Sequence, residues 1–327
     1  MDIYYNPLDR TCKSVCGGIR QNGSLTIQVY GKSDEPCTFV LQKDGGEAQS
    51  LHMQNVLGGW KIELSFAEAG LYFYWFRVGG RRMGMGRDRS LCFSETAPAY
   101  QILVYREDFV TPDWFKGGIM YQIFPDRFRR RGSVSVGKGQ WLHQNWNERP
   151  EFRANENGKV LNNDFFGGNF RGIIEKLGYL KALHVTVLYL NPIFRAYSNH
   201  RYDTGDYMQV DPVLGTEEDF AMLVAECEQN GIRVILDGVF NHTGDDSRYF
   251  NKYGNYDELG AYQSKESKYY AWYNFRHFPD KYDSWWGIDV LPAVNESCPS
   301  YIDFITGDKG VLRHWMQYGL GGFRLDV

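Results

Sequence analysis

An arginine and an aspartate stand two residues apart in the segment Phe323-Arg324-Leu325-Asp326-Val327. Apolar residues alternate with these two charges, a pattern that predicts a β-strand, and residues i and i+2 of a strand face the same side. The Arg324 guanidinium would therefore lie beside the Asp326 carboxylate, keep it ionised and fix its direction. The pair is either a structural ion pair or an oriented carboxylate available for chemistry.

Further polar residues stand at or just past the ends of other predicted strands. These residues are Asp126, Asn191, Asp237 and His242, with Asp326 as the last of the series. Parallel strands bring their carboxyl ends to one edge of a sheet, and barrel enzymes carry their chemistry at that edge. The placement therefore predicts one shared site.

Alternating strands and helices after Gly117 predict the elements that position these residues. Apolar runs predict strands, and residues with helical spacing predict the helices between them. The strands are expected at 119–124, 185–190, 232–236 and 323–327, and the helices at about 173–180, 216–230 and 300–318. Such alternation implies a parallel sheet with right-handed crossovers. A doubly wound sheet and a TIM barrel both fit, and the polar residues at the strand ends favour the barrel. The apolar strands predict that both faces of the sheet are covered.

Residues 1–108 differ from the rest of the chain. Short alternating runs separated by Gly, Asn and Asp predict an antiparallel β-sandwich. We expect a linker near 110–116 and a second domain over 109–327. Residues 242–299 are rich in loop signals, and we expect them to form an inserted domain after the third strand.

Composition excludes several classes of protein. The chain has 36 Lys and Arg against 40 Asp and Glu, a formal charge of −4, which argues against nucleic-acid binding by bulk charge. No apolar run reaches the ~18–20 residues of a membrane span. The first residues lack the basic and apolar regions of a secretion signal, so we expect a cytoplasmic protein with reduced cysteines. The closeness of Cys12 and Cys16 in the sequence is also compatible with a disulfide or with half of a metal site.

Four segments resemble the α-amylase family of glycoside hydrolases, in the order and on the elements typical of that family. They are Gly118-Ile-Met-Tyr-Gln-Ile-Phe-Pro-Asp-Arg-Phe128, Asp237-Gly-Val-Phe-Asn-His242, Leu291-Pro-Ala-Val-Asn295 and Gly322-Phe-Arg-Leu-Asp326. The resemblance covers about residues 110–327. With the N-terminal sandwich, the segment 198–207 resembles most the neopullulanase, cyclomaltodextrinase and maltogenic amylase group.

The resemblance implies a retaining mechanism, which needs two carboxyl groups about 5 Å apart. It implies that Asp326 is the nucleophile and that Asp237 pairs with Arg324. It places His242 on hydroxyls of the sugar in the cleavage subsite.

Aromatic residues complete the expected substrate site. The resemblance implies that Tyr202 forms a stacking platform beneath the same sugar, flanked by His200 and Asp203. Trp285 and Trp286 are either a packing plug or a further sugar subsite.

Two parts of the family pattern are not matched. The general acid, a Glu after a fifth strand, and the third carboxylate, after a seventh, are not found here. We therefore expect the chain to be the first half of a barrel from a longer protein, inactive by itself. The usual calcium ligands are replaced by Arg129-Arg130-Arg131 and Asn169, so we expect no metal and no other cofactor, with a calcium ion as the alternative. We expect the three arginines to form a solvated turn, with pairing to carboxylates as the alternative.

The expected function is hydrolysis of α-1,4 and also α-1,6 bonds in malto-oligosaccharides, cyclodextrins, pullulan or starch. The expected partners are α-glucan oligosaccharides and a second copy of the full-length protein, with no nucleic acid and no membrane. Two alternatives remain. The first is a transglycosylase of the same family, and the second is a fragment that acts only in glucan binding or assembly.

Overall fold

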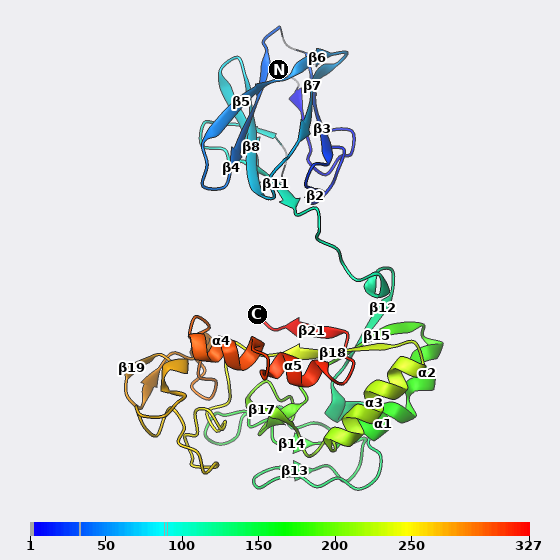
Figure 1. The fold of residues 1–327 in the computed structure, drawn as a ribbon, viewed down its shortest axis with the longest axis vertical. Helices are drawn as coiled ribbons and strands as arrows, with labels where there is room; N and C mark the ends of the chain where they lie inside the picture. Colours follow the sequence, from blue (N-terminus) through cyan, green and yellow to red (C-terminus); the bar gives the residue numbers. More distant parts are fainter. Residues whose placement is uncertain (1–2, 33, 88, 90) are drawn as a thin grey trace. The chain divides into compact units, whose positions relative to one another are not determined.

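The structure is a computed structural model that describes residues 3–32, 34–87, 89 and 91–327. The chain divides into two compact units, Met1–Thr111 and Pro112–Val327 (Figure 1).

The first unit consists of two sheets. One sheet has the order β1 (Ile3–Tyr4), β3 (Ser24–Gly31), β7 (Gly59–Ser65) and β6 (Gln54–Val56). The other has the order β10 (Leu91–Phe93), β9 (Arg81–Met85), β8 (Gly70–Val78), β11 (Tyr100–Tyr105) and β2 (Ile19–Arg20), with β4 (Cys37–Lys43) paired to β8 and β5 (Ala48–His52) paired to β4. The pairing of β2 with β11 is parallel, which differs from the antiparallel pattern that we expected.

One hydrophobic core joins the two sheets of this unit. Alternate residues of β3 are buried, as are residues of β7 in the same sheet and of β4 and β8 in the other. Leu25, Ile27 and Val29 point into this core together with Phe39 and Tyr74. The alternation follows from the two-residue period of a strand.

The second unit is built on a parallel sheet. Its strands are β12 (Ile119–Ile123), β15 (Val185–Leu190), β18 (Arg233–Gly238) and β21 (Gly322–Leu325), and they pair in chain order. A doubly wound sheet reverses its order at a switch point, so the sequential order is that of a barrel. Among the described residues the sheet does not close. β12 and β21 lie at its edges with exposed residues, so the expectation that all strands are covered on both faces is wrong for these two.

Five α-helices cover one face of this sheet. They are α1 (Phe170–Glu175), α2 (Leu177–Ala182), α3 (Glu217–Gln229), α4 (Pro299–Thr306) and α5 (Val311–Met316). Thr216 and Asp219 form a capping box at the start of α3, as their spacing predicts. The helix expected over 300–318 is divided between α4 and α5, because Gly307 and Gly310 cap their facing ends in extended conformation.

The two faces of the parallel sheet have different surroundings. Leu188 and Leu190 of β15 pack against the helices in the main core of the unit. Val187 and Tyr189 point the other way, where they pack with Ile235 and with Trp114. Residues that share the parity of Tyr189 and Ile235 therefore lie on the face away from the helices.

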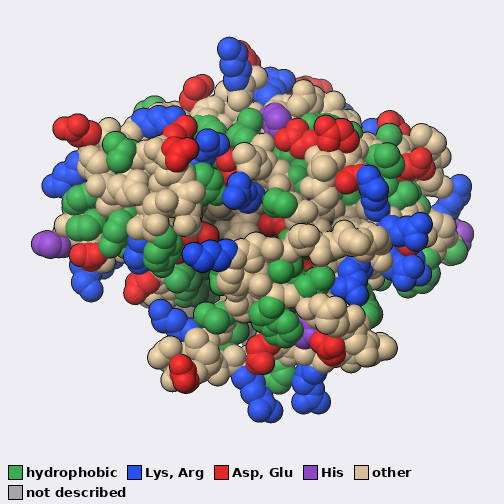
Figure 2. Space-filling model, turned by 90° about the horizontal axis from the view of Figure 1, so that it is seen from below, with side chains coloured by type: hydrophobic (Ala, Val, Ile, Leu, Met, Phe, Trp, Pro, Cys, Tyr) green, Lys and Arg blue, Asp and Glu red, His purple; other side chains and the backbone are tan. Residues whose placement is uncertain are grey.

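Loops and short elements connect these strands. They are η1 (Asp113–Phe115), η2 (Pro125–Arg127), β13 (Trp141–Leu142), β14 (Asp164–Phe165), β16 (Phe194–Ala196), β17 (Thr204–Val210), η3 (Tyr270–Trp272), β19 (Phe275–His277), β20 (Lys281–Tyr282) and η4 (Trp285–Gly287). All six cysteines are free. No helix in the described part of the chain combines the length and apolar character needed to cross a membrane. Figure 2 shows basic and acidic side chains interspersed on the face that it presents.

Candidate active site

Asp237, the last but one residue of β18, is a fully buried carboxylate with three donors. Arg324 Nη1 donates to its Oδ1 at 2.9 Å from the neighbouring strand β21. The hydroxyls of Tyr189 and Tyr202 both donate to its Oδ2, at 2.5 and 2.9 Å. Because Asp237 and Arg324 are register partners of adjacent strands, the sheet itself sets their pairing.

Arg324 also bonds to Asp326, so one guanidinium joins two carboxylates. Burial works to lower the pKa of Arg324, but its hydrogen bonds to Asp237 and Asp326 outweigh burial and raise that pKa. The guanidinium therefore stays charged. The backbone N–H of Asp326 donates to the carbonyl of Gly238 at 3.1 Å, which extends the pairing of β18 and β21 to the aspartate. The Asp326 side chain is 12% exposed.

Tyr202 is half-buried and bonded through its hydroxyl. Burial, with the charge of Asp237, raises its pKa to about 12, so the hydroxyl stays protonated and donates. The preceding residue, Arg201, is wholly buried with φ of 63° and donates to Asp211 Oδ1 at 3.2 Å. This buried arginine anchors the loop that carries Tyr202.

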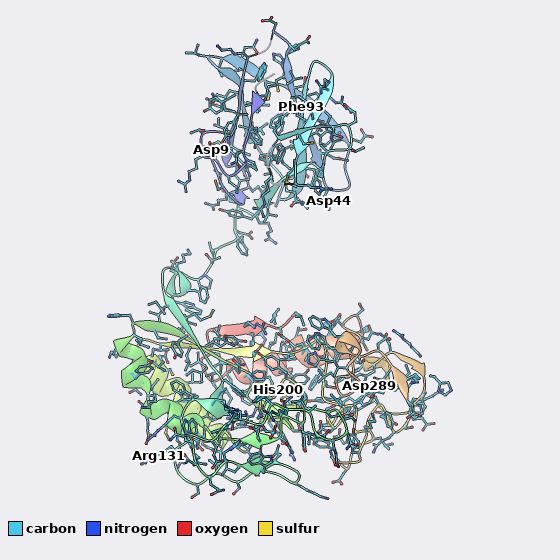
Figure 3. The ribbon with its side chains drawn as sticks, turned by 180° about the vertical axis from the view of Figure 1, so that it is seen from behind. Asp9, Asp44, Phe93, Arg131, His200 and Asp289 are labelled. Carbon is cyan, nitrogen blue, oxygen red and sulfur yellow. The ribbon has the colours of Figure 1, made fainter. Side chains whose placement is uncertain are left out.

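His200 and Asp203 hold the same loop through Ser198. The Ser198 hydroxyl bonds to His200 Nδ1 at 3.0 Å and also donates to Asp203. Burial lowers the pKa of His200, against the opposing charge of Asp203. The structure thus places both residues in the loop of Tyr202, which they support. Figure 3 labels His200 among the side chains of the second unit.

His242 is buried, with 1% of its surface exposed, and neither ring nitrogen has a hydrogen-bond partner among the described residues. Burial lowers its pKa, while the nearby charge of Asp326 works in the opposite direction. An unpartnered buried imidazole carries a desolvation cost, which a ligand hydroxyl would relieve.

Trp285 and Trp286 extend an aromatic surface outward from His242. The rings of His242 and Trp285 lie 5.3 Å apart, and those of Trp285 and Trp286 stack at 4.8 Å with an interplanar angle of 5°. Trp286 has φ of 52° and is 84% exposed, so it is not a buried packing residue.

Asp126, another polar residue at a strand end, has a structural environment. Its buried carboxylate accepts from the backbone N–H groups of Phe166 and Gly167, at 3.0 and 2.9 Å. Burial raises its pKa despite these bonds. Asp126 thereby fixes the loop that leads into α1.

Asn169 and the three arginines Arg129–Arg131 do not fit a calcium site. The arginines lie in the loop that follows β12 and η2, here called the first loop. Asn169 Oδ1 caps α1 by accepting from Gly172 N at 2.9 Å, and its amide donates to the carbonyl of Arg131. Arg129 and Arg131 pair with the two oxygens of Glu175, at 3.1 and 2.8 Å. The solvated basic turn that we expected is therefore wrong, because Glu175 on α1 lies within reach. Within the described ranges, no group of three or more His, Cys, Asp or Glu side chains is placed to hold a metal ion.

The structure thus brings Arg324, Asp326, Asp237 and Tyr202 into one bonded network. The charge of Asp326 and the backbone of Tyr202 act on His242, which links it to this network. Sequence reasoning missed Tyr189, because its place in an apolar strand indicated a core residue. Its position relative to Asn191 could have indicated its role, because residues two apart in a strand lie on the same face. The amide of Asn191 donates to the Tyr202 hydroxyl at 3.4 Å.

Comparisons with known proteins agree on one family. The family model described as "Alpha amylase, catalytic domain" matches residues 122–290. An amylopullulanase of Thermoanaerobacterium saccharolyticum is 38% identical over 383 residues, which cover 100% of this chain and 30% of that protein. The chain spans 30% or less of the amylopullulanases that it matches.

Two solved structures are similar in sequence and fold. The cyclic alpha-maltosyl-(1→6)-maltose hydrolase of Arthrobacter globiformis has 34% identity and a TM-score of 0.55, covering 67% of this chain and 46% of that chain. The type III pullulan hydrolase of Thermococcus kodakarensis has 27% identity and a TM-score of 0.58, covering 100% of this chain and 56% of that chain.

Proposed function

This chain belongs to the alpha-amylase family, and on that premise we propose that it supplies the nucleophile of a retaining α-glucan hydrolase. The resemblance to this family is confirmed, and the family model matches residues 122–290. The second unit accordingly has a TIM-barrel glycosidase fold, of which the four parallel strands form an open part. The proposed substrates are α-1,4-linked and α-1,6-linked glucans.

In the proposed first step, a carboxylate oxygen of Asp326 attacks the anomeric carbon of the bound sugar. A bond forms between Asp326 and that carbon while the glycosidic C–O bond breaks, and the leaving oxygen takes a proton from a second carboxylic acid. In the second step water attacks the same carbon, its proton returns to the second acid, and the Asp326 carboxylate is released. No described residue is proposed as this second acid.

One observation carries the proposal: Arg324 donates two hydrogen bonds, one to Asp237 and one to Asp326. Asp237 and its two tyrosine donors fix the guanidinium, and the guanidinium orients Asp326. A carboxylate held in one direction by a charged donor is the arrangement that a nucleophile needs.

Substrate binding is proposed for the residues around this network. The ring of Tyr202 offers a platform for the sugar, and His242 offers two unpartnered nitrogens for its hydroxyls. Trp286 offers an exposed aromatic surface for a more distant sugar. His200 and Asp203 support the Tyr202 loop.

Finer features of the architecture and assembly are part of the same proposal. Residues 1–108 form a β-sandwich, and residues 109–327 form the first half of the barrel with a loop-rich insertion at 242–299. The arginine pairs with Glu175 hold the first loop without calcium. The full-length protein is a homodimer.

The test is Asp326→Asn in the complete protein that contains this chain. The change keeps the shape of the side chain but removes the attacking charge. We expect hydrolysis of maltoheptaose to be lost while binding of maltoheptaose, measured by titration calorimetry, is retained. Normal turnover by this variant would remove Asp326 from the proposed role.

A further inference from the structure

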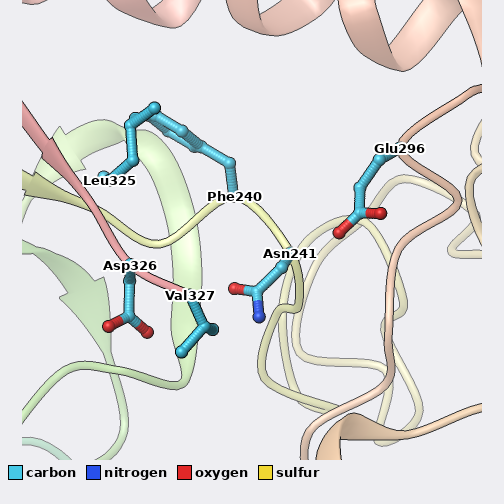
Figure 4. Close-up of a pocket in the computed structure, with 7 residues that line it drawn as sticks. Phe240, Asn241, Glu296, Leu325, Asp326 and Val327 are labelled. Atoms are coloured by element: carbon cyan, nitrogen blue, oxygen red, sulfur yellow. The ribbon is translucent and has the colours of Figure 1, made fainter. Parts of the chain in front are cut away.

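The ring of Tyr202 must be held at both ends if it is to fix a sugar that Asp326 attacks. Asp326 borders an open hollow, which Asn241 also lines (Figure 4). The hydroxyl end of Tyr202 donates to Asp237 at 2.9 Å. The backbone end follows a segment that is bonded to another buried carboxylate, that of Asp164. What holds Asp164 therefore bears on where the ring lies.

Asp164, the first residue of β14, is 1% exposed and gathers donors from separate segments of the chain. Arg127 Nη2 donates to its Oδ2 at 3.2 Å, and His143 Nε2 lies 3.1 Å from the same oxygen. Asn199 Nδ2 donates to its Oδ1 at 2.9 Å. A buried carboxylate shared by several donors fixes them relative to one another, because losing any one bond leaves a buried acceptor partly unsatisfied.

His143 is 2% exposed and lies between two carboxylates. Its Nδ1 is 2.6 Å from Glu148 Oε2, and its Nε2 faces Asp164 Oδ2. A neutral imidazole donates from one nitrogen, whereas the protonated ring donates from both, so the protonated ring satisfies both bonds. The bond to His143 lowers the pKa of Glu148, which keeps that carboxylate an acceptor. The ring also stacks on Phe166, with 4.0 Å between the centroids, so its orientation is fixed.

Asn199 stands three residues before Tyr202 and joins Asp164 to the segment that carries the ring. Its side-chain amide also donates to the carbonyl oxygen of Asp164 at 2.9 Å, and its backbone N–H donates to Asn162 O at 2.7 Å. Its own carbonyl accepts from Arg201 Nη1 at 2.8 Å. Asn199 is thus bonded to the β14 segment on one side and to the residue before Tyr202 on the other.

We propose that His143 is a positioning residue, which acts through Asp164 and Asn199 to hold the ring of Tyr202 beneath the sugar that is cleaved. This inference rests on the proposed function, because it takes Tyr202 as the platform. His143 binds one oxygen of Asp164 and so keeps the other turned toward Asn199. Without this donor the carboxylate can turn, and the segment that carries Tyr202 shifts with it. A small displacement of the ring moves the sugar out of line with the attacking carboxylate.

The experiment introduces His143→Gln into the complete protein, because a single amide nitrogen cannot donate to carboxylates on two sides of the side chain. We expect kcat/KM for maltoheptaose to fall about tenfold. The same change is combined with Tyr202→Phe, which keeps the ring, and with Tyr202→Ala, which removes it. The loss should stay about tenfold in Tyr202→Phe and disappear in Tyr202→Ala, since a positioning residue has no effect once the group that it positions is gone.

The matched control is Arg129→Gln. Arg129 pairs with Glu175 at 3.1 Å, so this change removes an ion pair from the first loop and leaves the bonds of Asp164 intact. It should keep the kcat/KM of the wild type. If His143→Gln does not fold, as judged by circular dichroism, Asn199→Ala takes its place in the same series. It removes the link at its other end and should give the same pattern.

Three results would overturn the inference. The first is an unchanged kcat/KM in His143→Gln. The second is an equal loss with Tyr202, Phe and Ala at position 202, which indicates only a smaller folded fraction. The third is a loss that disappears in Tyr202→Phe, which assigns the effect to the hydroxyl. A wild-type protein that does not cleave maltoheptaose contradicts the proposed function and this inference with it, whereas an active wild type with any of the three results contradicts the inference alone.

Discussion

Arg324 donates to the buried carboxylate of Asp237 across the β18–β21 pair, with 2.9 Å between Nη1 and Oδ1. The same nitrogen bonds to Asp326, so a fixed structural carboxylate and a candidate nucleophile share one cation. Asp237 is inaccessible to solvent, whereas Arg324 is 41% exposed. Asp237 therefore depends on the arginine for its charge balance, and the arginine depends on Asp237 for its direction.

Replacing Arg324 by glutamine should impair catalysis more than folding. Asp326 loses the group that orients it, and we expect kcat to fall by about 100-fold or more. Tyr189 and Tyr202 still donate to Asp237, so we expect a loss of about 1–3 kcal/mol in the free energy of unfolding. Steady-state kinetics on maltoheptaose and denaturant unfolding measure the two effects.

The control for this change is Arg233→Gln on the neighbouring strand. Arg233 is 45% exposed and lies 3.8 Å from Glu228, itself 64% exposed, so the pair contributes little. This variant should retain normal kcat. A normal kcat in Arg324→Gln as well would mean that Arg324 does not orient the nucleophile.

His242 makes stability depend on pH. Burial lowers its pKa, so below the ordinary value of about 6.5 the unfolded chain binds a proton that the folded protein resists. The contribution of His242 to stability should therefore fall as the pH drops from 7 to 5, whereas Asp246, whose pKa burial raises to about 7, contributes in the opposite direction over the same range. We expect His242→Gln to reduce this slope, with part of it remaining because burial also lowers the pKa of His200.

Urea unfolding at several pH values between 5 and 7 measures this slope. His277→Gln, at an exposed histidine of β19, should keep the wild-type dependence. A slope in His242→Gln equal to that of the wild type would show that the imidazole accepts a proton equally well in the folded protein.

The first loop of the second unit should be stabilised by salt-sensitive ion pairs. Glu175→Gln removes the pairs with Arg129 and Arg131, all of whose side chains are 31–62% exposed. We expect a loss of up to about 1 kcal/mol at low salt and less at 1 M salt. EDTA should leave the unfolding midpoint of the wild type unchanged, and a fall of several degrees would show that a cation holds this loop.

The strand order and the facing of the charged residues could be predicted from the sequence. Period-two alternation places Arg324 and Asp326 on one face, and the apolar runs mark the four parallel strands. These features are local, because they depend on residue spacing within one element.

Contacts between distant segments could not be predicted. Glu175 pairs with Arg129 across 46 residues, and Tyr189 bonds to Asp237 across 48. Nothing near Arg129 indicates which carboxylate will reach it. From the sequence, Asn169 could be interpreted only as a weak replacement for an acidic metal ligand. Its role as the N-cap of α1 could not be predicted, because that role depends on where the helix begins.

The most direct measurement is the trapping of the covalent intermediate. A fluorinated α-glucosyl fluoride slows release of the sugar from a retaining enzyme, so the sugar stays attached to the nucleophile. Peptide mass spectrometry of the complete protein should then find the added mass on Asp326, and the Asp326→Asn variant should carry none. Label on a different carboxylate, or equal labelling of the variant, would contradict the assignment of Asp326 as the nucleophile.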